Sequence, residues 1–388
     1  MSLKQRGVAL ALLAGILSSS GMVAQQAVPM DQRAKPGSSP ADPGPMATDL
    51  SPAIKSAAIK AAVKKVADWQ LTQIVNTPSQ DWTYATMYAG FMAASELLKD
   101  DRYSKEVQGV AEHYNWTLGP REIHADDQAI GQSYIALYRQ KKDPIRIAAT
   151  KAQFDKVLLI PDDPKKQVWW WCDALFMAPP VWAGMSKITG DPKYRNYMDH
   201  EWEVSANLLW DKDESLFYRD ASYFEKREKN GKKIFWSRGN GWVMGGIVRT
   251  LNELPANDSK RPYYLAKYKA MSIKMAALQS EDGLWRPGLL DAADYPLPEV
   301  SGSAFFVYAM AWGINNHVLD EAKYGPVVRK GWAGIISHIY ADGRLGAIQP
   351  IGAAPGAFTA GSSYVYGTGA FMMAGQEMDK LSLRGAKK

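Results

Sequence analysis

The sequence has little of what metal and redox sites require. Cys172 is the single cysteine among 388 residues, so an internal disulfide is excluded. The five histidines form no HExxH motif, and neither a P-loop nor a GxGxxG turn after a strand is present. We therefore expect no metal and no cofactor. Cys172 lies among apolar residues with no histidine near it in sequence, which favours a buried, inert thiol over a nucleophile.

Charge of one sign and long apolar runs are also scarce. The formal net charge is +6, and the 46 basic and 40 acidic residues are spread along the chain. This pattern does not indicate nucleic-acid binding, although a weakly basic protein slightly favours an acidic sugar as substrate. Beyond the N-terminal segment, no apolar run reaches the length that spans a membrane.

The N-terminus has the features of an export signal. Lys4 and Arg6 precede an apolar run over 8–17 that is too short for a membrane span, and cleavage after Ala24 is expected. We predict a signal peptide over 1–24, a flexible Pro- and Ser-rich linker over 25–50 and a catalytic domain over 51–388. The mature protein is expected in the periplasm or secreted, without stable membrane insertion.

Helical periodicity dominates the rest of the chain and alternates between two kinds of segment. Amphipathic, charged segments are predicted over 51–75, 102–116, 144–158, 191–209, 261–280 and 320–340. Segments rich in Gly, Ala, Met and aromatic residues follow them, over 82–98, 126–138, 172–187, 240–254, 302–316 and 366–379. The second kind suits helices enclosed by other helices. The alternation predicts an all-α fold, an (α/α)6 barrel of six helical hairpins.

In such a barrel the inner helices run in one direction, so their N-terminal ends share one rim. Polar and aromatic residues gather at these ends, among them Trp82, His124, Asp173, Arg238 and Tyr366. Helix N-termini also offer unpaired N–H groups to an anion. We therefore expect one pocket at this rim.

The motif WWWCDALFMAPP at 169–180 is the sharpest candidate for chemistry. Three tryptophans before Asp173 form a desolvating wall, which raises the pKa of a carboxyl group toward that of a general acid. The alternative is that Asp173 only caps its own helix.

A second acidic motif, HADDQ at 124–128, begins another candidate inner helix. Asp126 and Asp127 point in different directions on a helix, so at most one faces the pocket. The alternative is an acidic first turn that complements the helix dipole, with His124 beside it.

A third motif, FWSRGNGW at 235–242, combines a guanidinium with two indoles. Arg238 can bind a carboxylate through two hydrogen bonds, and Trp236 and Trp242 can hold a sugar ring. An arginine that binds backbone carbonyls and serves only the structure is the alternative.

Together these motifs resemble glycoside hydrolase family 105, the unsaturated rhamnogalacturonyl hydrolases, and more remotely the family 88 unsaturated glucuronyl hydrolases. The resemblance extends over about 55–380 and implies Asp173 as general acid and base, with Asp126 favoured over Asp127 as the second acid. It also implies substrate contacts by Trp171, Trp236, Arg238 and Trp242. Where some members have a histidine, this chain reads LFYRDASY, so Arg219 or Tyr218 is expected there.

The implied reaction is hydration of the C4–C5 double bond of a 4,5-unsaturated uronic acid on a lyase-generated oligosaccharide. The first expectation is release of unsaturated galacturonate from rhamnose, as in pectin degradation. Unsaturated glucuronyl substrates and a non-catalytic glycan-binding toroid are the alternatives. An epimerase is disfavoured, since only His124 lies at a candidate rim position.

Overall fold

The computed structural model describes residues 35–74, 77–163 and 166–385, and their structure is mainly helical. The outer helices are α1 (Ser56–Ile74), α3 (Arg102–His113), α6 (Ile145–Val157), α9 (Pro192–Leu209), α11 (Arg261–Leu278) and α13 (Glu321–Ile336). The inner helices are α2 (Trp82–Leu98), α4 (Ala125–Gln128) with α5 (Gly131–Gln140), α7 (Ala174–Met177) with α8 (Pro179–Thr189), α10 (Ser237–Glu253), α12 (Val300–Asn315) and α14 (Val365–Gly385).

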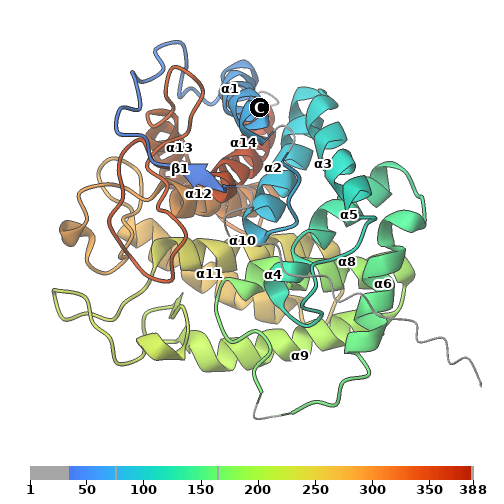
Figure 1. The fold of residues 1–388 in the computed structure, drawn as a ribbon. Helices are drawn as coiled ribbons and strands as arrows, with labels where there is room; N and C mark the ends of the chain where they lie inside the picture. Colours follow the sequence, from blue (N-terminus) through green and yellow to red (C-terminus); the bar gives the residue numbers. More distant parts are fainter. Residues whose placement is uncertain (1–34, 75–76, 164–165, 386–388) are drawn as a thin grey trace, which may run out of the picture. The chain divides into compact units, whose positions relative to one another are not determined.

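The inner helices form a closed ring. In chain order α2, α5, α8, α10, α12 and α14 each pack against the next, and α14 returns to pack against α2 (Figure 1). Each outer helix packs on the inner helix that follows or precedes it. The predicted (α/α)6 barrel is confirmed, and each predicted helical segment overlaps one of these helices, although the inner ones begin or end a few residues outside the predicted bounds.

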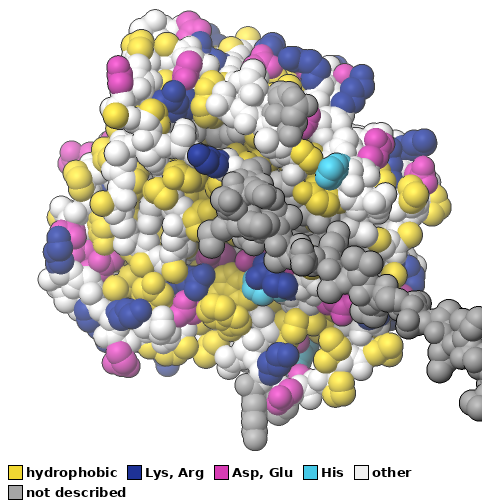
Figure 2. All heavy atoms as spheres, viewed as in Figure 1, with side chains coloured by type: hydrophobic (Ala, Val, Ile, Leu, Met, Phe, Trp, Pro, Cys, Tyr) yellow, Lys and Arg dark blue, Asp and Glu magenta, His cyan; other side chains and the backbone are white. Residues whose placement is uncertain are grey.

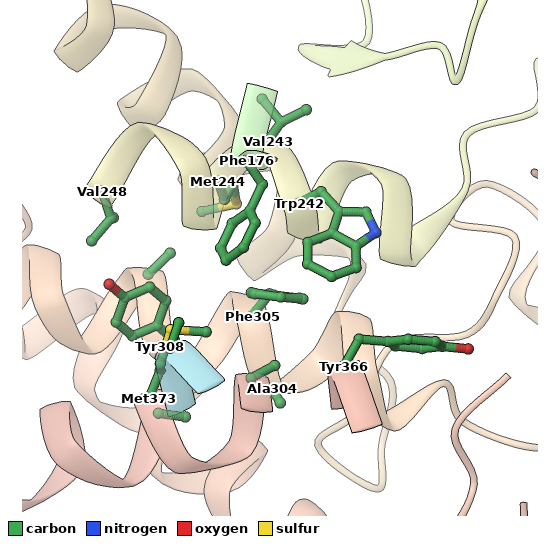
Figure 3. Packing of buried hydrophobic residues seen from close by; sticks show 14 of the residues in the cluster. Phe176, Trp242, Val243, Met244, Val248, Ala304, Phe305, Tyr308, Tyr366 and Met373 are labelled. Atoms are coloured by element: carbon green, nitrogen blue, oxygen red, sulfur yellow. The ribbon is translucent and has the colours of Figure 1, made fainter. Parts of the chain in front are cut away.

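Small and aromatic residues explain why the inner helices pack so closely. A methyl group on Gly90 of α2 would lie 2.6 Å from the Cα atom of Gly369 on α14, so these two helices touch through backbone. Figure 3 shows that aromatic side chains fill the space between the inner helices, where Phe176, Trp242 and Phe305 meet. Their ring centroids are 4.5 to 5.3 Å apart, within the range of favourable aromatic pairs.

Residues 35–50 are attached to the barrel by backbone hydrogen bonds. Strand β1 (Gly37–Ser38) pairs antiparallel with β4 (Ser363–Tyr364), and Ala47 N–H donates to the carbonyl of Ile339 at 2.9 Å. The sequence suggested a flexible linker here because large apolar side chains are missing. The amino-acid composition could not predict these contacts, because they are hydrogen bonds between backbone groups and do not depend on side chains. The predicted signal peptide and the linker residues before 35 lie outside the described residues.

The surface agrees with the even charge distribution of the sequence. On the face in Figure 2, basic and acidic side chains are interspersed with hydrophobic ones. Among the helices of the described ranges, none combines the length and apolar character that crossing a membrane needs.

Candidate active site

Two inner positions of the barrel begin with a separate single turn of helix. Turn α4 precedes α5, and turn α7 precedes α8, which starts at Pro179. Proline has no N–H for the helix ladder, and its ring disfavours a continuous helix through Ala178. Each turn presents an acid motif at the rim, and the two turns pack against each other. HADDQ and WWWCD, about 45 residues apart in sequence, thereby form one site.

Asp173 is the buried acid of this site. It is 7% exposed and occupies the N-cap position of α7, yet its side chain makes no capping hydrogen bond. The thiol of Cys172 donates to its Oδ1 at 3.2 Å. Burial raises the pKa of Asp173 above its ordinary value, while the charges of Arg219 and Arg238 oppose that rise. The alternative that Asp173 only caps its own helix therefore does not hold in this structure.

The adjacent acids of α4 have different environments. Burial, together with the negative charge of Asp173, raises the pKa of Asp126 to about 7. Asp127 instead accepts from the backbone N–H of Arg121 at 2.7 Å and forms an ion pair with its guanidinium at 2.5 Å. Asp126 is therefore the acid coupled to Asp173, and Asp127 anchors the preceding loop.

His124 and Trp171 form one wall beside these acids. Nδ1 of His124 accepts from the backbone N–H of Asp126 at 3.3 Å, which caps α4. Burial lowers the pKa of His124, so the neutral ring that can accept this bond is favoured. Its ring centroid lies 4.8 Å from that of Trp171, which is 3% exposed.

Arg219 is the cation with the largest effect on Asp173. It follows strand β3 (Leu216–Phe217), which pairs with β2 (Trp210–Asp211), and its carbonyl accepts from the N–H of Cys172 at 2.8 Å. Its Nη1 donates to Asp220 at 2.7 Å, and its side chain is 20% exposed. The partly exposed guanidinium of Arg219 can therefore still bind an anion near Asp173.

Tyr218, the other candidate in LFYRDASY, has a different role. Its hydroxyl donates to Asp211 at 3.2 Å, and its ring packs on Phe224 and Phe235. The loop therefore offers Arg219, and not Tyr218, to the acids.

Arg238 and Trp236 are placed differently from the expectation of substrate contact. Arg238 is 0% exposed, and its two terminal nitrogens donate to the carbonyls of Gln349 and Pro350 at 2.6 and 2.7 Å. Trp236 donates from Nε1 to the Gln349 side chain at 2.9 Å. These two donors hold the loop at 349–350, while the Nε of Arg238 is buried without a hydrogen-bond partner. In this conformation Arg238 serves the structure, and its expected pairing with a uronate carboxylate stays a prediction.

The remaining aromatic candidates form a layer below this loop. The rings of Trp82 and Tyr366 are stacked at 5.6 Å, and Trp242 meets Trp82 edge-on at 5.9 Å. Trp242 and Tyr366 are 0% exposed, and the Tyr366 hydroxyl donates to the Gln349 carbonyl. Of these three residues, only Trp82 is partly exposed. In this conformation a ligand can therefore contact Trp82 but not Trp242 or Tyr366.

Two features of the site were missed by the sequence reasoning. Trp170 is 45% exposed, lies 5.0 Å from Trp171 and has the Arg219 guanidinium 5.4 Å from its ring. Cys172 contacts the acid directly. The WWWCD motif contained both residues, but three consecutive tryptophans in a loop carry no periodicity that tells which one is exposed. Within the described residues, no group of three or more acidic, His or Cys side chains could hold a metal ion.

The fold and the site define a barrel of paired helices with two adjacent buried acids at its rim. The chain belongs to glycosyl hydrolase family 88, whose model matches residues 54–382. The resemblance inferred from the motifs is thus confirmed, with the family first noted as the more remote one providing the match.

Relatives and solved structures agree with this assignment. An unsaturated 3S-rhamnoglycuronyl hydrolase from Formosa agariphila is 41% identical over 83% of this chain and 91% of its own length. A protein of the same name from an Alteromonas species is 32% identical over 97% and 98%. A family 88 structure from Bacteroides vulgatus has a TM-score of 0.78 at 31% identity over 83% and 98%. A possible family 105 member from Salmonella enterica, at 21% identity over 83% and 93% with a TM-score of 0.70, shows the same fold.

Proposed function

We propose that this glycosidase removes a 4,5-unsaturated uronic acid from the non-reducing end of lyase-generated oligosaccharides, with rhamnose as the leaving sugar. The observation that carries the proposal is the placement of Asp173, which is buried, free of any capping bond, and coupled to both Asp126 and Arg219. The names of the two relatives support the unsaturated uronyl group and the rhamnose.

The reaction requires one group that gives and later takes a proton. The substrate is a vinyl ether, and Asp173 protonates its C4, which leaves an oxocarbenium ion at C5. Water adds to C5 as Asp173 accepts its proton, and the resulting hemiketal opens and releases the leaving sugar. The anomeric carbon is never attacked. The relation between carboxylate separation and stereochemistry therefore does not apply.

The neighbouring residues bind the substrate and adjust the pKa of the acid pair. Arg219 takes the role first expected of Arg238 and pairs with the uronate carboxylate, because its side chain is 20% exposed and its charge acts on Asp173. Asp126 holds a ring hydroxyl and raises the proton affinity of the pair. Exposed Trp170 supplies an apolar face to the leaving sugar.

The substrate is tested by incubating the purified protein with unsaturated disaccharides and following the ultraviolet absorbance of the conjugated ene-carboxylate. We expect loss of absorbance with uronyl-rhamnose substrates, and slower loss with galacturonyl-galacturonate and with glucuronyl substrates that lack rhamnose. Comparing unsaturated galacturonyl-rhamnose with glucuronyl-rhamnose decides between a pectin context and other polysaccharides. Persistent absorbance throughout, with retained binding, would instead favour a glycan-binding protein.

Export is a further part of this proposal. Lys4, Arg6 and the apolar run after them support a cleaved signal and a periplasmic or secreted location. Mass analysis of the mature N-terminus, with cell fractionation, tests it. An intact Met1 on cytoplasmic protein would contradict it.

A further inference from the structure

Residues 35–38 cross the seam at which the barrel closes. Strand β1 pairs with β4, which leads directly into α14, and the backbone N–H of Val365 donates to the carbonyl of Pro36 at 2.8 Å (Figure 1). On the other side of the seam, the hydroxyl group of Tyr84 in α2 donates to the carbonyl of Lys35 at 2.9 Å. The segment is thereby bonded to both the first and the last inner helix.

The contact between β1 and β4 leaves no room for a side chain at Gly37. A Cβ atom added there would lie 2.2 Å from the carbonyl oxygen of Ser363 and 2.5 Å from the ring of Tyr364. Carbon atoms in ordinary contact are about 3.5 to 4.0 Å apart, so any larger residue must displace one of the two strands. Glycine therefore allows the backbone of β1 to lie directly against the Tyr364 ring.

Tyr364 is the first ring of a stacked column that reaches the rim. The ring centroids of Tyr364 and Tyr366 are 5.7 Å apart, those of Tyr366 and Trp82 are 5.6 Å apart, and both interplanar angles are 19°. These distances are within the range of favourable aromatic pairs. Tyr366 is buried, while Trp82, the first residue of α2, is partly exposed. The column therefore runs from β1 to a ring that a ligand can contact.

The other end of the attached segment is held by different elements. The carbonyl of Pro45 accepts from the N–H of Ala341 at 2.9 Å, in the connection between α13 and α14. Asp49, whose side chain is 64% exposed, pairs with Lys65 of α1 at 2.9 Å. Such an exposed ion pair contributes little to stability. Residues 45–49 are thus attached independently of β1.

We propose that residues 35–38 are a positioning element of the active site, which holds the column of Tyr364, Tyr366 and Trp82 so that the Trp82 ring packs against the substrate sugar. The proposal rests on the proposed function, because the ligand is the oligosaccharide named there. Ordering a free side chain on binding costs conformational entropy, and a ring that is already held avoids this cost. Residues 35–38 therefore act on affinity and touch none of the reacting atoms.

The test is steady-state kinetics of full-length variants on an unsaturated uronyl-rhamnose disaccharide. Gly37→Val, which forces β1 away from Tyr364, should raise KM about tenfold and leave kcat within about twofold of the wild-type value. Tyr84→Phe removes only the hydroxyl that binds the carbonyl of Lys35, and it should raise KM about threefold. This second variant keeps the test usable if Gly37→Val does not fold. Asp49→Asn is the matched control and should behave like the wild type.

A double-mutant cycle with Trp82→Ala separates positioning of the column from a general structural role. If residues 35–38 act through Trp82, Gly37→Val should change KM less than about twofold in the Trp82→Ala background. An equal rise of KM in both backgrounds would overturn the proposal. A wild-type KM in both Gly37→Val and Tyr84→Phe would also overturn it.

Failure of the proposed function has a different signature. In that case the wild type leaves every unsaturated disaccharide unchanged, and calorimetric titration with the same uronyl-rhamnose disaccharide gives Kd in place of KM. Weaker binding by Gly37→Val than by the wild type and Asp49→Asn would still support the role of residues 35–38. Equal binding by all three proteins, or no binding by the wild type, would overturn that role.

Discussion

The starts of α7 and α10 lie at the same rim, and both carry tryptophans next to an ionisable residue. At α7, Asp173 has no capping bond and its charge interacts with acids and cations from other segments. At α10, Arg238 is 0% exposed, and its two terminal nitrogens donate to backbone carbonyls, while its Nε has no partner. The comparison teaches that the bonds a buried group already makes, more than its burial, decide whether it is free to react.

The largest effect that tests this comparison is expected from Asp173→Asn. The variant should lose activity roughly a thousandfold, because an amide cannot give the proton that Asp173 transfers to C4. Its unfolding midpoint should stay close to that of the wild type, since Asp173 caps nothing. Turnover and thermal unfolding measure the two quantities. Asp127→Asn is the contrasting acid and should lose stability through its Arg121 pair while retaining most activity. Full activity of Asp173→Asn would reject the mechanism.

The two arginines should respond in opposite ways. Arg219→Gln should raise KM for unsaturated disaccharides roughly 10- to 100-fold with little change in stability, through loss of a charged hydrogen bond. Arg238→Gln should lower the free energy of unfolding by about 3 kcal/mol, since two carbonyls and Glu299 lose their partner. Denaturant titration and steady-state kinetics separate the outcomes. A purely kinetic effect at Arg238 would restore its expected role in substrate binding.

The raised pKa of Asp126 predicts that the wild type and Asp126→Asn differ in stability by an amount that depends on pH. Its pKa rises from 3.8 to about 7 on folding, so the folded state favours the protonated form. The stability from this preference is complete below about pH 4 and is lost as the pH rises through 7. Asp126→Asn, always neutral, should therefore match the wild type at pH 4 and exceed it by about 4 kcal/mol at pH 8. Denaturant unfolding at both pH values measures this, and equal stabilities at pH 8 would contradict it.

The smallest expected effect belongs to Cys172. Its thiol donates to Asp173 and lowers the pKa of that carboxyl, so Cys172→Ala should move the alkaline limb of the pH–rate profile upward. The change in kcat should be about two- to tenfold, the value of one hydrogen bond. Cys172→Ser keeps a donor and should retain the wild-type profile. A Cys172→Ala profile identical to that of the wild type would show that the thiol only fills space.

The sequence predicted the barrel because its inner helices are recognisable by composition, as the contact of Gly90 with Gly369 illustrates. It also predicted that Asp173 and one of two acids converge. It could not decide between Asp126 and Asp127, since α4 is a single turn and tertiary contacts with Arg121 set its rotation. The true partners of Arg238 lie more than 100 residues away in a loop without a pattern.

The ring closes only where α14 packs against α2, the last inner helix against the first. During synthesis, α2 therefore exposes an apolar face until α14 has left the ribosome. Such late, long-range closure slows folding and lengthens the time during which nascent chains can aggregate. Deleting the final helix should consequently harm recovery from cells more than it harms any single catalytic step.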